Sequence, residues 1–160
     1  EDLLTYARQD ELRLEEFDLP VLINEVMSSI SLPEDIRVTV NLPKTRFMIS
    51  DRDKVRQIIL NLIQNSLDAM DKGGSLTITA EDKKNSTGLS VSDTGIGIDS
   101  DSTDKVFKPF YTTKAKGTGL GLAIVWRYIS ALGGKISVES EKDKGTTFRI
   151  LIPKKIKKVA

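Results

Sequence analysis

The segment DRDKVRQIILNLIQNSLDAMD, residues 51–71, carries the strongest helical pattern of the chain. At about 100° per residue, its large apolar side chains fall on one broad face of a helix. That face is formed by Val55, Ile58, Ile59, Leu62, Ile63 and Met70. Asp51 or Asp53 can supply the N-cap or a first-turn carboxylate, and Gly73-Gly74 can end the helix. We therefore predict an amphipathic helix that buries one of its sides.

Shorter patterns on both sides of this segment predict the other elements. One helix is expected to begin with Pro20 in its first turn and to run to about residue 29, and another covers residues 118–132. Alternating apolar residues predict strands at 37–42, 47–50, 75–81, 89–93, 135–140 and 146–152. The first two strands are expected to pair across a turn at Pro43, and the last two across a turn at residues 143–145. Residues 95–119 show no regular pattern.

These elements predict an α+β fold with two layers. About three helices would pack on one face of a mixed, mostly antiparallel five-stranded sheet. Residues 1–16 also look helical, and because no capping residue precedes them, they suggest the end of a longer element. We therefore expect residues 17–160 to form the domain proper.

The composition excludes several classes of protein. A chain of 160 residues with a net charge of +1 offers no overall electrostatic argument for binding nucleic acid or a membrane. The absence of cysteine excludes a disulfide framework and thiolate chemistry. No apolar run approaches the length of a membrane span, so a cytoplasmic location is expected. The basic tail, residues 154–160, is expected to be frayed and solvated, without a nucleic-acid partner.

Asn61, Asn65 and Asp68 lie at i, i+4 and i+7 and form one polar stripe beside the apolar face of the helix. An amide oxygen is a neutral hard ligand, which suits a magnesium ion that also binds phosphate oxygens. The alternative is an ordinary polar helix face. However, asparagine is unfavourable inside a helix, so two asparagines one turn apart require a reason.

Residues 93–97, DTGIG, directly follow a predicted strand. The Asp93 carboxylate would end that strand, while the glycines let the backbone turn sharply and approach a ligand. A buried carboxylate here could accept a hydrogen bond from the amino group of adenine. The alternative is a simple strand-to-loop turn.

Residues 117–122, GTGLGL, open a predicted helix, whose free N–H groups and partial positive charge favour phosphate. The segment differs from the dinucleotide fingerprint because its third glycine falls one place early and no strand precedes it. It also lacks the Gly-Lys-Thr or Gly-Lys-Ser of a Walker A loop. The alternative is a flexible entry to the helix.

Residues 107–114, FKPFYTTK, precede that glycine-rich segment. Their aromatic side chains could anchor a mobile lid while Lys114 reaches a phosphate. Taken alone, the segment is equally an aromatic-anchored surface loop.

In this order and spacing, the four segments resemble the N, G1, F and G2 boxes of sensor histidine kinases. The resemblance covers roughly residues 20–153, and the run over residues 107–124 is highly specific. It implies the Bergerat fold, which is shared with gyrase B subunits, heat-shock chaperones and mismatch-repair proteins. Asp68 stands where many of these kinases have a basic residue, which makes the chain similar to the nitrogen- and dicarboxylate-sensing branch.

The resemblance also implies ATP and Mg²⁺ as ligands, with Asn65 as the metal ligand and Asn61 and Lys114 as catalytic positions. Asp93 would bind the adenine amino group, with Gly97 beneath the base. The implied nucleotide-binding set is Asn61, Asn65, Asp93, Gly95, Gly97, Ile98, Thr113, Lys114, Gly117, Thr118, Gly119, Leu120, Gly121, Leu122 and Thr146.

Within this set, Lys114 and the amides of residues 118–122 would meet the phosphates, and Thr146 would support the adenine contacts. Asp68 replaces a basic residue that contacts phosphate, and Lys72, one turn further, is a candidate to compensate.

Kinases of this family phosphorylate a histidine on a dimerising helical hairpin, and this chain contains no histidine. Residues 1–16 resemble the end of the second hairpin helix. The resemblance therefore implies a catalytic fragment, itself monomeric. Its expected partners are ATP or ADP, the histidine-bearing dimerisation domain of the same parent kinase, and a downstream response regulator.

Two other functions found in the same superfamily stay open. An ATP-hydrolysing enzyme needs a carboxylate four residues before the metal-binding asparagine to activate water, and Asn61 at that position is a poor base. A nucleotide-binding regulator would hold a protein partner without chemistry, although the hairpin-like residues 1–16 argue against it.

Overall fold

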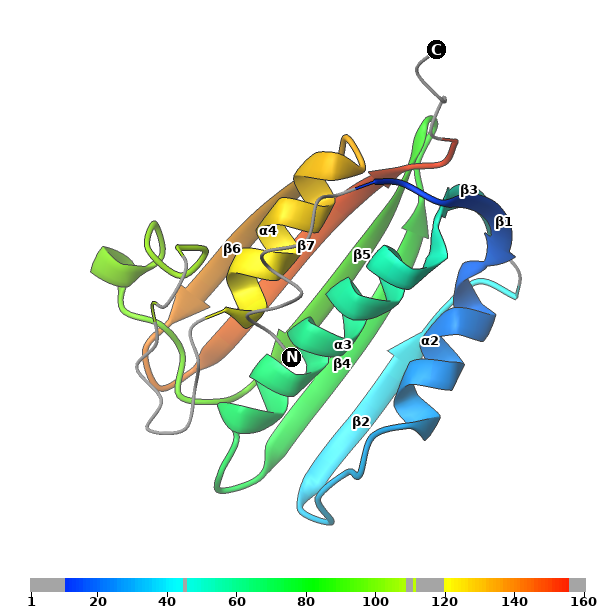
Figure 1. Ribbon diagram of the computed structural model, residues 1–160. Coiled ribbons are helices and arrows are strands. Elements are labelled where there is room, and N and C mark those ends of the chain that lie inside the picture. The colour runs from blue at the N-terminus through cyan, green and yellow to red at the C-terminus, as the bar shows by residue number, and fades with distance from the viewer. Residues whose placement is uncertain (1–10, 45, 109–110, 112–119, 156–160) are drawn as a thin grey trace.

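The computed structural model describes residues 11–44, 46–108, 111 and 120–155. The described residues form three α-helices, α2 (Leu19–Ser28), α3 (Arg52–Asp68) and α4 (Gly121–Ala131), which cover one face of a five-stranded sheet (Figure 1). The sheet has the strand order β2-β4-β5-β7-β6. Its strands are β2 (Ile36–Asn41), β4 (Gly74–Asp82), β5 (Ser86–Asp93), β6 (Lys135–Glu141) and β7 (Gly145–Pro153).

Strands β2 and β4 are parallel, and the other neighbouring strands of this sheet are antiparallel. This arrangement confirms the predicted α+β class, with helices on one side of a mixed, mostly antiparallel sheet. The other side of the sheet carries hydroxyl side chains, which bond across strands in the pairs Thr79–Ser90 and Ser92–Thr147. Alternation of apolar and polar residues along each strand explains why only one side is covered.

Helix α3 occupies the middle of the helical layer and begins as predicted. The Asp51 side chain accepts a hydrogen bond from the Lys54 N–H and caps the helix. Its predicted apolar face is fully buried against the sheet and the other helices. The helix ends at Asp68, three residues earlier than the segment suggested, and Met70 N–H then bonds to the Leu67 carbonyl, three residues back. The Ala69 carbonyl accepts a hydrogen bond from Ile96 N–H at 3.0 Å. Gly73, with φ of 86°, lies in the turn that follows.

The predicted pairing of residues 47–50 with residues 37–42 is wrong. Strand β3 (Phe47–Asp51) instead pairs antiparallel with β1 (Leu14–Asp18) in a separate two-stranded sheet. Strand β2 pairs with β4 along one edge only, and two hydrogen bonds hold the chain after β2 next to β1 instead. Arg46 N–H donates to the Asp18 carboxylate at 2.7 Å, and Leu19 N–H donates to the Arg46 carbonyl at 2.9 Å.

The prediction of a helix over residues 1–16 is also wrong for the part of this range that the structure describes. Leu14, Glu15 and Glu16 are extended in β1, opposite Asp51, Ser50 and Ile49. A strand forms here because β3 offers a free edge for pairing, and this long-range partner overrides the local helical pattern. Residues 1–10 of that expectation lie outside the described residues.

The C-terminal half follows the sequence closely. Helix α4 starts at Gly121, and residues 118 and 119 of its predicted start lie outside the described residues. Gly133, with φ of 74°, stops the helix as expected. Strands β6 and β7 pair antiparallel across a turn that contains Asp143 with φ of 66°. In the irregular region, residues 100–102 form one short 3₁₀ helix, η1 (Ser100–Ser102).

The first residues of the basic tail are held rather than frayed. Lys154 N–H donates to the Asn85 carbonyl at 3.1 Å, and Ile49 N–H donates to the Lys154 carbonyl at 2.9 Å. The Asp82 carboxylate bridges Arg46 at 2.8 Å and Lys154 at 2.7 Å. These contacts tie the two-stranded sheet to the end of β7. No helix of the described part of the chain is long and apolar enough to cross a membrane.

Candidate functional site

The first and third motifs meet through Asn61. Its side-chain N–H donates to the Gly121 carbonyl at 3.2 Å, and its side-chain oxygen accepts from the Gln57 side chain at 3.0 Å. Asn61 therefore bonds α3 to the first residue of α4. Both ends of its amide are used in these contacts, which is a physical reason for an asparagine inside a helix.

Asn65 lies one turn further along α3 and is half-buried, whereas Asp68 at the end of the helix is exposed. The polar stripe predicted from the sequence thus runs from the α4 contact toward the end of α3. Within the described ranges, no group of three or more acidic side chains is placed to hold a metal ion. A magnesium ion at this stripe would consequently need oxygen ligands from a phosphate in addition to the Asn65 amide.

Asp93 ends β5 and is 4% exposed. One of its carboxylate oxygens accepts a hydrogen bond from Gly95 N–H at 2.9 Å, which fixes the turn that follows the strand. Gly95 is required by packing, because a Cβ at this position would lie 2.3 Å from the Ala69 carbonyl oxygen. The second motif is therefore pressed against the C-terminal end of α3.

Gly97 is also required by packing. It has a φ of 72°, and a Cβ there would lie 2.1 Å from the Glu141 carbonyl oxygen. Asp143 N–H donates to the Ile96 carbonyl beside it at 2.6 Å. The glycine thus lets the loop after β5 lie against the β6–β7 turn.

A pair of hydroxyl groups lies next to Asp93. Thr146 is 4% exposed and stands directly opposite Asp93 in the pairing of β5 with β7. The Thr146 and Ser140 side-chain oxygens are 2.7 Å apart. Ser140 also accepts a hydrogen bond from Ile98 N–H at 2.7 Å. Ser140 was not selected from the sequence, although a polar residue at a helix-facing position of β6 was a detectable signal.

Thr94 is a second residue of this region that the sequence did not identify. Its hydroxyl accepts a hydrogen bond from Ser75 N–H at 2.9 Å and so ties the second motif to the start of β4. A threonine inside the Asp-Thr-Gly turn gives no signal of this partner, because the partner is distant in sequence.

Gly121 differs from Gly95 and Gly97. A Cβ at this position would meet no atom of the described residues within 4 Å. The packing of the described residues therefore does not require glycine here, and the backbone at the start of α4 is open to close approach. Its neighbours in the motif, Leu120 and Leu122, are buried and half-buried in the core.

The predicted residues Thr113, Lys114, Gly117, Thr118 and Gly119 lie outside the described residues. The structure thus joins Asn61 to Gly121, and it places Gly95 and Thr146 next to Asp93. The other phosphate-side positions remain predictions.

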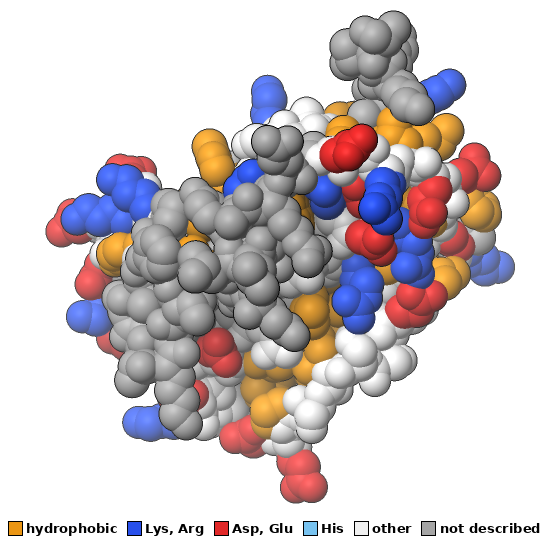
Figure 2. Space-filling model, viewed as in Figure 1, with side chains coloured by type: hydrophobic (Ala, Val, Ile, Leu, Met, Phe, Trp, Pro, Cys, Tyr) orange, Lys and Arg blue, Asp and Glu red, His pale blue; other side chains and the backbone are white. Residues whose placement is uncertain are grey.

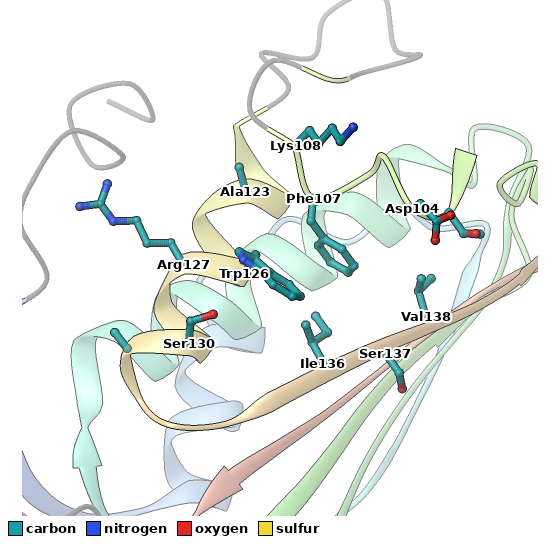
Figure 3. Close-up of a pocket in the computed structure, with 12 residues that line it drawn as sticks. Asp104, Phe107, Lys108, Ala123, Trp126, Arg127, Ser130, Ile136, Ser137 and Val138 are labelled. Carbon is teal, nitrogen blue, oxygen red and sulfur yellow. The ribbon is translucent and has the colours of Figure 1, made fainter. Parts of the chain in front are cut away.

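A cavity of about 1030 Å³ lies elsewhere, between α4, β6 and the segment that contains Phe107 (Figure 3). Phe107 and Trp126 form its aromatic wall, with ring centroids 5.6 Å apart, and Ile136 and Val138 form its floor. The motif residues Asn61, Asp93 and Thr146 do not line it. Phe107 and Lys108 of the fourth motif do line it. We therefore place the candidate site at the other three motifs, where polar groups converge, rather than in this cavity. On the face shown in Figure 2, acidic and basic side chains of the described residues are interspersed.

The chain is similar to known proteins in both sequence and fold. Residues 50–156 match the family described as histidine kinase-, DNA gyrase B-, and HSP90-like ATPase. The chain is 36% identical over 159 residues to the sensor histidine kinase ZraS of Escherichia coli K12, which covers 95% of this chain and 34% of ZraS. The chain therefore spans about a third of the length of that curated relative.

Solved structures show the same fold. The nucleotide-free catalytic domain of histidine kinase ThkA has a TM-score of 0.80 at 33% identity, covering 89% of this chain and 97% of that domain. ThkA in complex with the response regulator protein TrrA has a TM-score of 0.81 at 31% identity, covering 96% and 45%. Full-length ShkA in complex with AMPPNP has a TM-score of 0.83 at 30% identity, covering 95% and 34%.

Proposed function

The chain belongs to the family of histidine kinase-, DNA gyrase B- and HSP90-like ATPases and is homologous to sensor histidine kinase catalytic domains, and on this basis we propose that it transfers the γ-phosphoryl group of ATP to a histidine. The acceptor would lie outside these residues, because the sequence contains no histidine. The contact between Asn61 and Gly121 carries the proposal. The contact joins the first motif to the third. The Asn61 amide stands where an ATP-hydrolysing relative needs a carboxylate to activate water.

Adenine recognition is assigned to the end of β5. A buried carboxylate accepts a hydrogen bond well from an exocyclic amine, and Asp93 is buried beside Thr146. Gly95, Gly97 and Ile98 would shape the loop beside the base. The AMPPNP bound by the related ShkA supports an adenine nucleotide as the ligand.

The phosphates are assigned to the start of α4 and to residues before it. The open backbone at Gly121 suits a phosphate at a helix N-terminus. The positions outside the described residues, Lys114 foremost, would add charge. Phosphoryl transfer depends mainly on positioning and charge neutralisation, so a lysine, helix amides and a metal suffice on the donor side.

Mg²⁺ is proposed as the metal, with Asn65 as its protein ligand. The half-buried Asn65 amide on the polar stripe of α3 fits a hard cation that is bound mainly through nucleotide phosphates. When bound, the ion would neutralise phosphate charge. Asp68 and Lys72 would then tune the charge near the phosphates, and the assignment to the nitrogen- and dicarboxylate-sensing branch rests on Asp68 alone.

The proposed partners follow from the missing acceptor. A histidine-bearing dimerisation domain of the same parent would supply the imidazole and its acid–base group. A response regulator would take the phosphoryl group onward, as the complex of the related ThkA with TrrA suggests. We further propose that residues 1–16 join the chain to the dimerisation domain, that residues 17–160 act as a monomeric cytoplasmic unit, and that no nucleic acid takes part.

Phosphate transfer tests the proposal. The chain alone, incubated with γ-³²P-labelled ATP, should remain unlabelled and release phosphate very slowly. Addition of the histidine-bearing hairpin of the parent kinase should produce acid-labile label on the hairpin, weakly because the covalent tether is absent. Rapid phosphate release by the chain alone would support an ATP-hydrolysing function instead.

The metal assignment needs a separate measurement. Calorimetry should show that ATP binds more tightly in Mg²⁺ than in EDTA, and that Asn65→Ala removes this difference. Gln64→Ala, at the exposed neighbouring position, serves as the control. Equal ATP affinity in EDTA and Mg²⁺ would exclude Asn65 from the assigned role.

A further inference from the structure

Ser140 is the centre of a hydrogen-bond cluster beside the predicted base site. Its hydroxyl oxygen lies 2.7 Å from Ile98 N, 2.7 Å from the Thr146 hydroxyl oxygen and 3.0 Å from the Gly145 carbonyl oxygen. The three partners come from the loop after β5 and from the start of β7. One side chain thus connects the loop that carries the second motif to the strand that carries Thr146.

The hydrogens in this cluster can be assigned by counting. A serine hydroxyl has one hydrogen to donate and two lone pairs that accept. Ile98 N–H can only donate, so it takes one lone pair of Ser140. The Gly145 carbonyl can only accept, so it takes the Ser140 hydrogen. The remaining contact is with Thr146, and the hydrogen in it must therefore come from Thr146.

The direction of that bond matters for the neighbouring site. With its hydrogen committed to Ser140, the Thr146 hydroxyl presents only lone pairs to its surroundings. Thr146 stands opposite Asp93 in the strand pairing, and both side chains are buried. The end of the β5–β7 pair consequently offers two neighbouring acceptors, a carboxylate and a hydroxyl oxygen.

We propose that Ser140 is a positioning residue that sets base selectivity by holding Thr146 as a hydrogen-bond acceptor. This inference rests on the proposed function. Two acceptors, used directly or through one water, match an exocyclic amino group, which has two hydrogens. A base with a carbonyl oxygen at that place meets acceptors only. Without Ser140, the Thr146 hydroxyl can rotate and donate to such an oxygen, so discrimination falls.

Binding of ATP and inosine triphosphate tests this directly, because inosine has a carbonyl oxygen where adenine has the amino group. We expect wild-type protein to prefer ATP, and Ser140→Ala to reduce the ratio of the two affinities roughly tenfold, the scale of one lost polar interaction. Ser140→Thr keeps the hydroxyl and should restore most of the ratio. Ser137→Ala, at an exposed position of the same strand, should not change it.

A double-mutant cycle separates orientation from general loosening of the loop. Thr146→Val removes the hydroxyl at nearly constant shape. If Ser140 acts through Thr146, Ser140→Ala should reduce the ratio no further in the Thr146→Val background. Independent, additive effects of the two substitutions would overturn the inference.

The remaining outcomes are also decisive. If the wild-type protein binds no ATP, the proposed function fails, and the inference fails with it. If wild type prefers ATP and Ser140→Ala keeps the full preference, only the inference is wrong. If Ser140→Ala does not fold, Thr146→Val provides the test. A Thr146→Val variant that keeps the wild-type preference for ATP over inosine triphosphate would overturn the inference.

Discussion

The side-chain amide of Asn61 donates a hydrogen bond to the Gly121 carbonyl at 3.2 Å. This contact fixes α3 to the first residue of α4, so the polar stripe of one helix and the glycine-rich start of the other share one rigid junction. A carboxylate at position 61 could not donate this bond. The junction therefore favours an amide at the position where related hydrolases need a base.

Asn61→Asp should lower both stability and ATP affinity without increasing hydrolysis. The introduced carboxylate would face the Gly121 carbonyl, acceptor against acceptor, while Gln57 could still donate to it. Loss of such a bond costs on the order of 1–3 kcal/mol. Thermal unfolding, calorimetry with ATP and a phosphate-release assay would measure these effects. Gln64→Glu makes the same chemical change at an exposed position of α3 and should do little; a large gain in ATP hydrolysis by Asn61→Asp would contradict us.

Gly121→Ala should weaken ATP binding while leaving the fold intact. A Cβ here meets no atom within 4 Å, so the substitution introduces no clash among the described residues. Alanine is also a better helix former than glycine by up to about 1 kcal/mol. We expect an unchanged or raised Tm together with at least a tenfold loss of ATP affinity. Gly88→Ala on β5, whose Cβ would make an ordinary contact at 3.5 Å, is the control, and unaltered ATP binding by Gly121→Ala would argue against phosphate at this point.

Gly97→Ala should have the opposite profile, with a clear loss of stability. The residue has a φ of 72°, and its Cβ would lie 2.1 Å from the Glu141 carbonyl oxygen. A backbone conformation of this kind costs a non-glycine residue on the order of 1–3 kcal/mol before the clash is added. Chemical denaturation without nucleotide would measure the difference. Wild-type stability of Gly97→Ala would mean that the loop after β5 does not press against the β6–β7 turn.

Asp93→Asn should fold normally but bind ATP more weakly. The asparagine side-chain oxygen can still accept the hydrogen bond from Gly95 N–H, which wild type makes at 2.9 Å. Its NH₂ group, however, would meet the amino group of adenine, donor against donor. The binding free energy of ATP should become less favourable by about 1–3 kcal/mol, and the difference between the affinities for ATP and GTP should become smaller. Full ATP affinity in competition binding would show that another group reads the base.

Asp82→Asn should reduce the sensitivity of the fold to acid. The hydrogen bond from Lys154, followed by the charge of Arg46, holds the pKa of Asp82 below its ordinary value of 3.8. A lowered pKa in the folded state means that the carboxylate stabilises the fold above about pH 4, and that this contribution disappears as the pH falls further. The stability difference between wild type and Asp82→Asn should therefore shrink below pH 4.

Salt distinguishes this effect from a packing effect. Asp82 is 63% exposed, so high ionic strength should also diminish the stability difference between wild type and Asp82→Asn at pH 7. Urea titrations at pH 7 and pH 3, in low and high salt, would measure it. Asp71→Asn, at an exposed acid in the turn after α3, is the matched control. A difference that is independent of both pH and salt would show that Asp82 acts through packing alone.

Local pattern was sufficient for most elements. The apolar face of residues 51–71 predicts α3, because a helix places residues with this spacing on one side whatever its partners are. Alternation likewise predicts β4, β5, β6 and β7, and the glycines at 133 and 145 mark the ends where φ is positive. The motifs gave the nucleotide-binding family, since each needs only a few neighbouring residues.

The sequence by itself thus determined the layers of the fold, the family, and the motif residues at the end of β5 and at the start of α4. Tertiary structure alone decided the partners: that β3 pairs with β1, that Asn61 reaches Gly121, and that Ser140 accepts a hydrogen bond from Ile98 N–H. Helical and strand periods are properties of short segments, whereas strand pairing and side-chain bonds depend on surfaces that folding brings together. A polar residue at a helix-facing position, such as Ser140, can be found from the sequence, but its partner Ile98 cannot, because the two residues lie far apart along the chain.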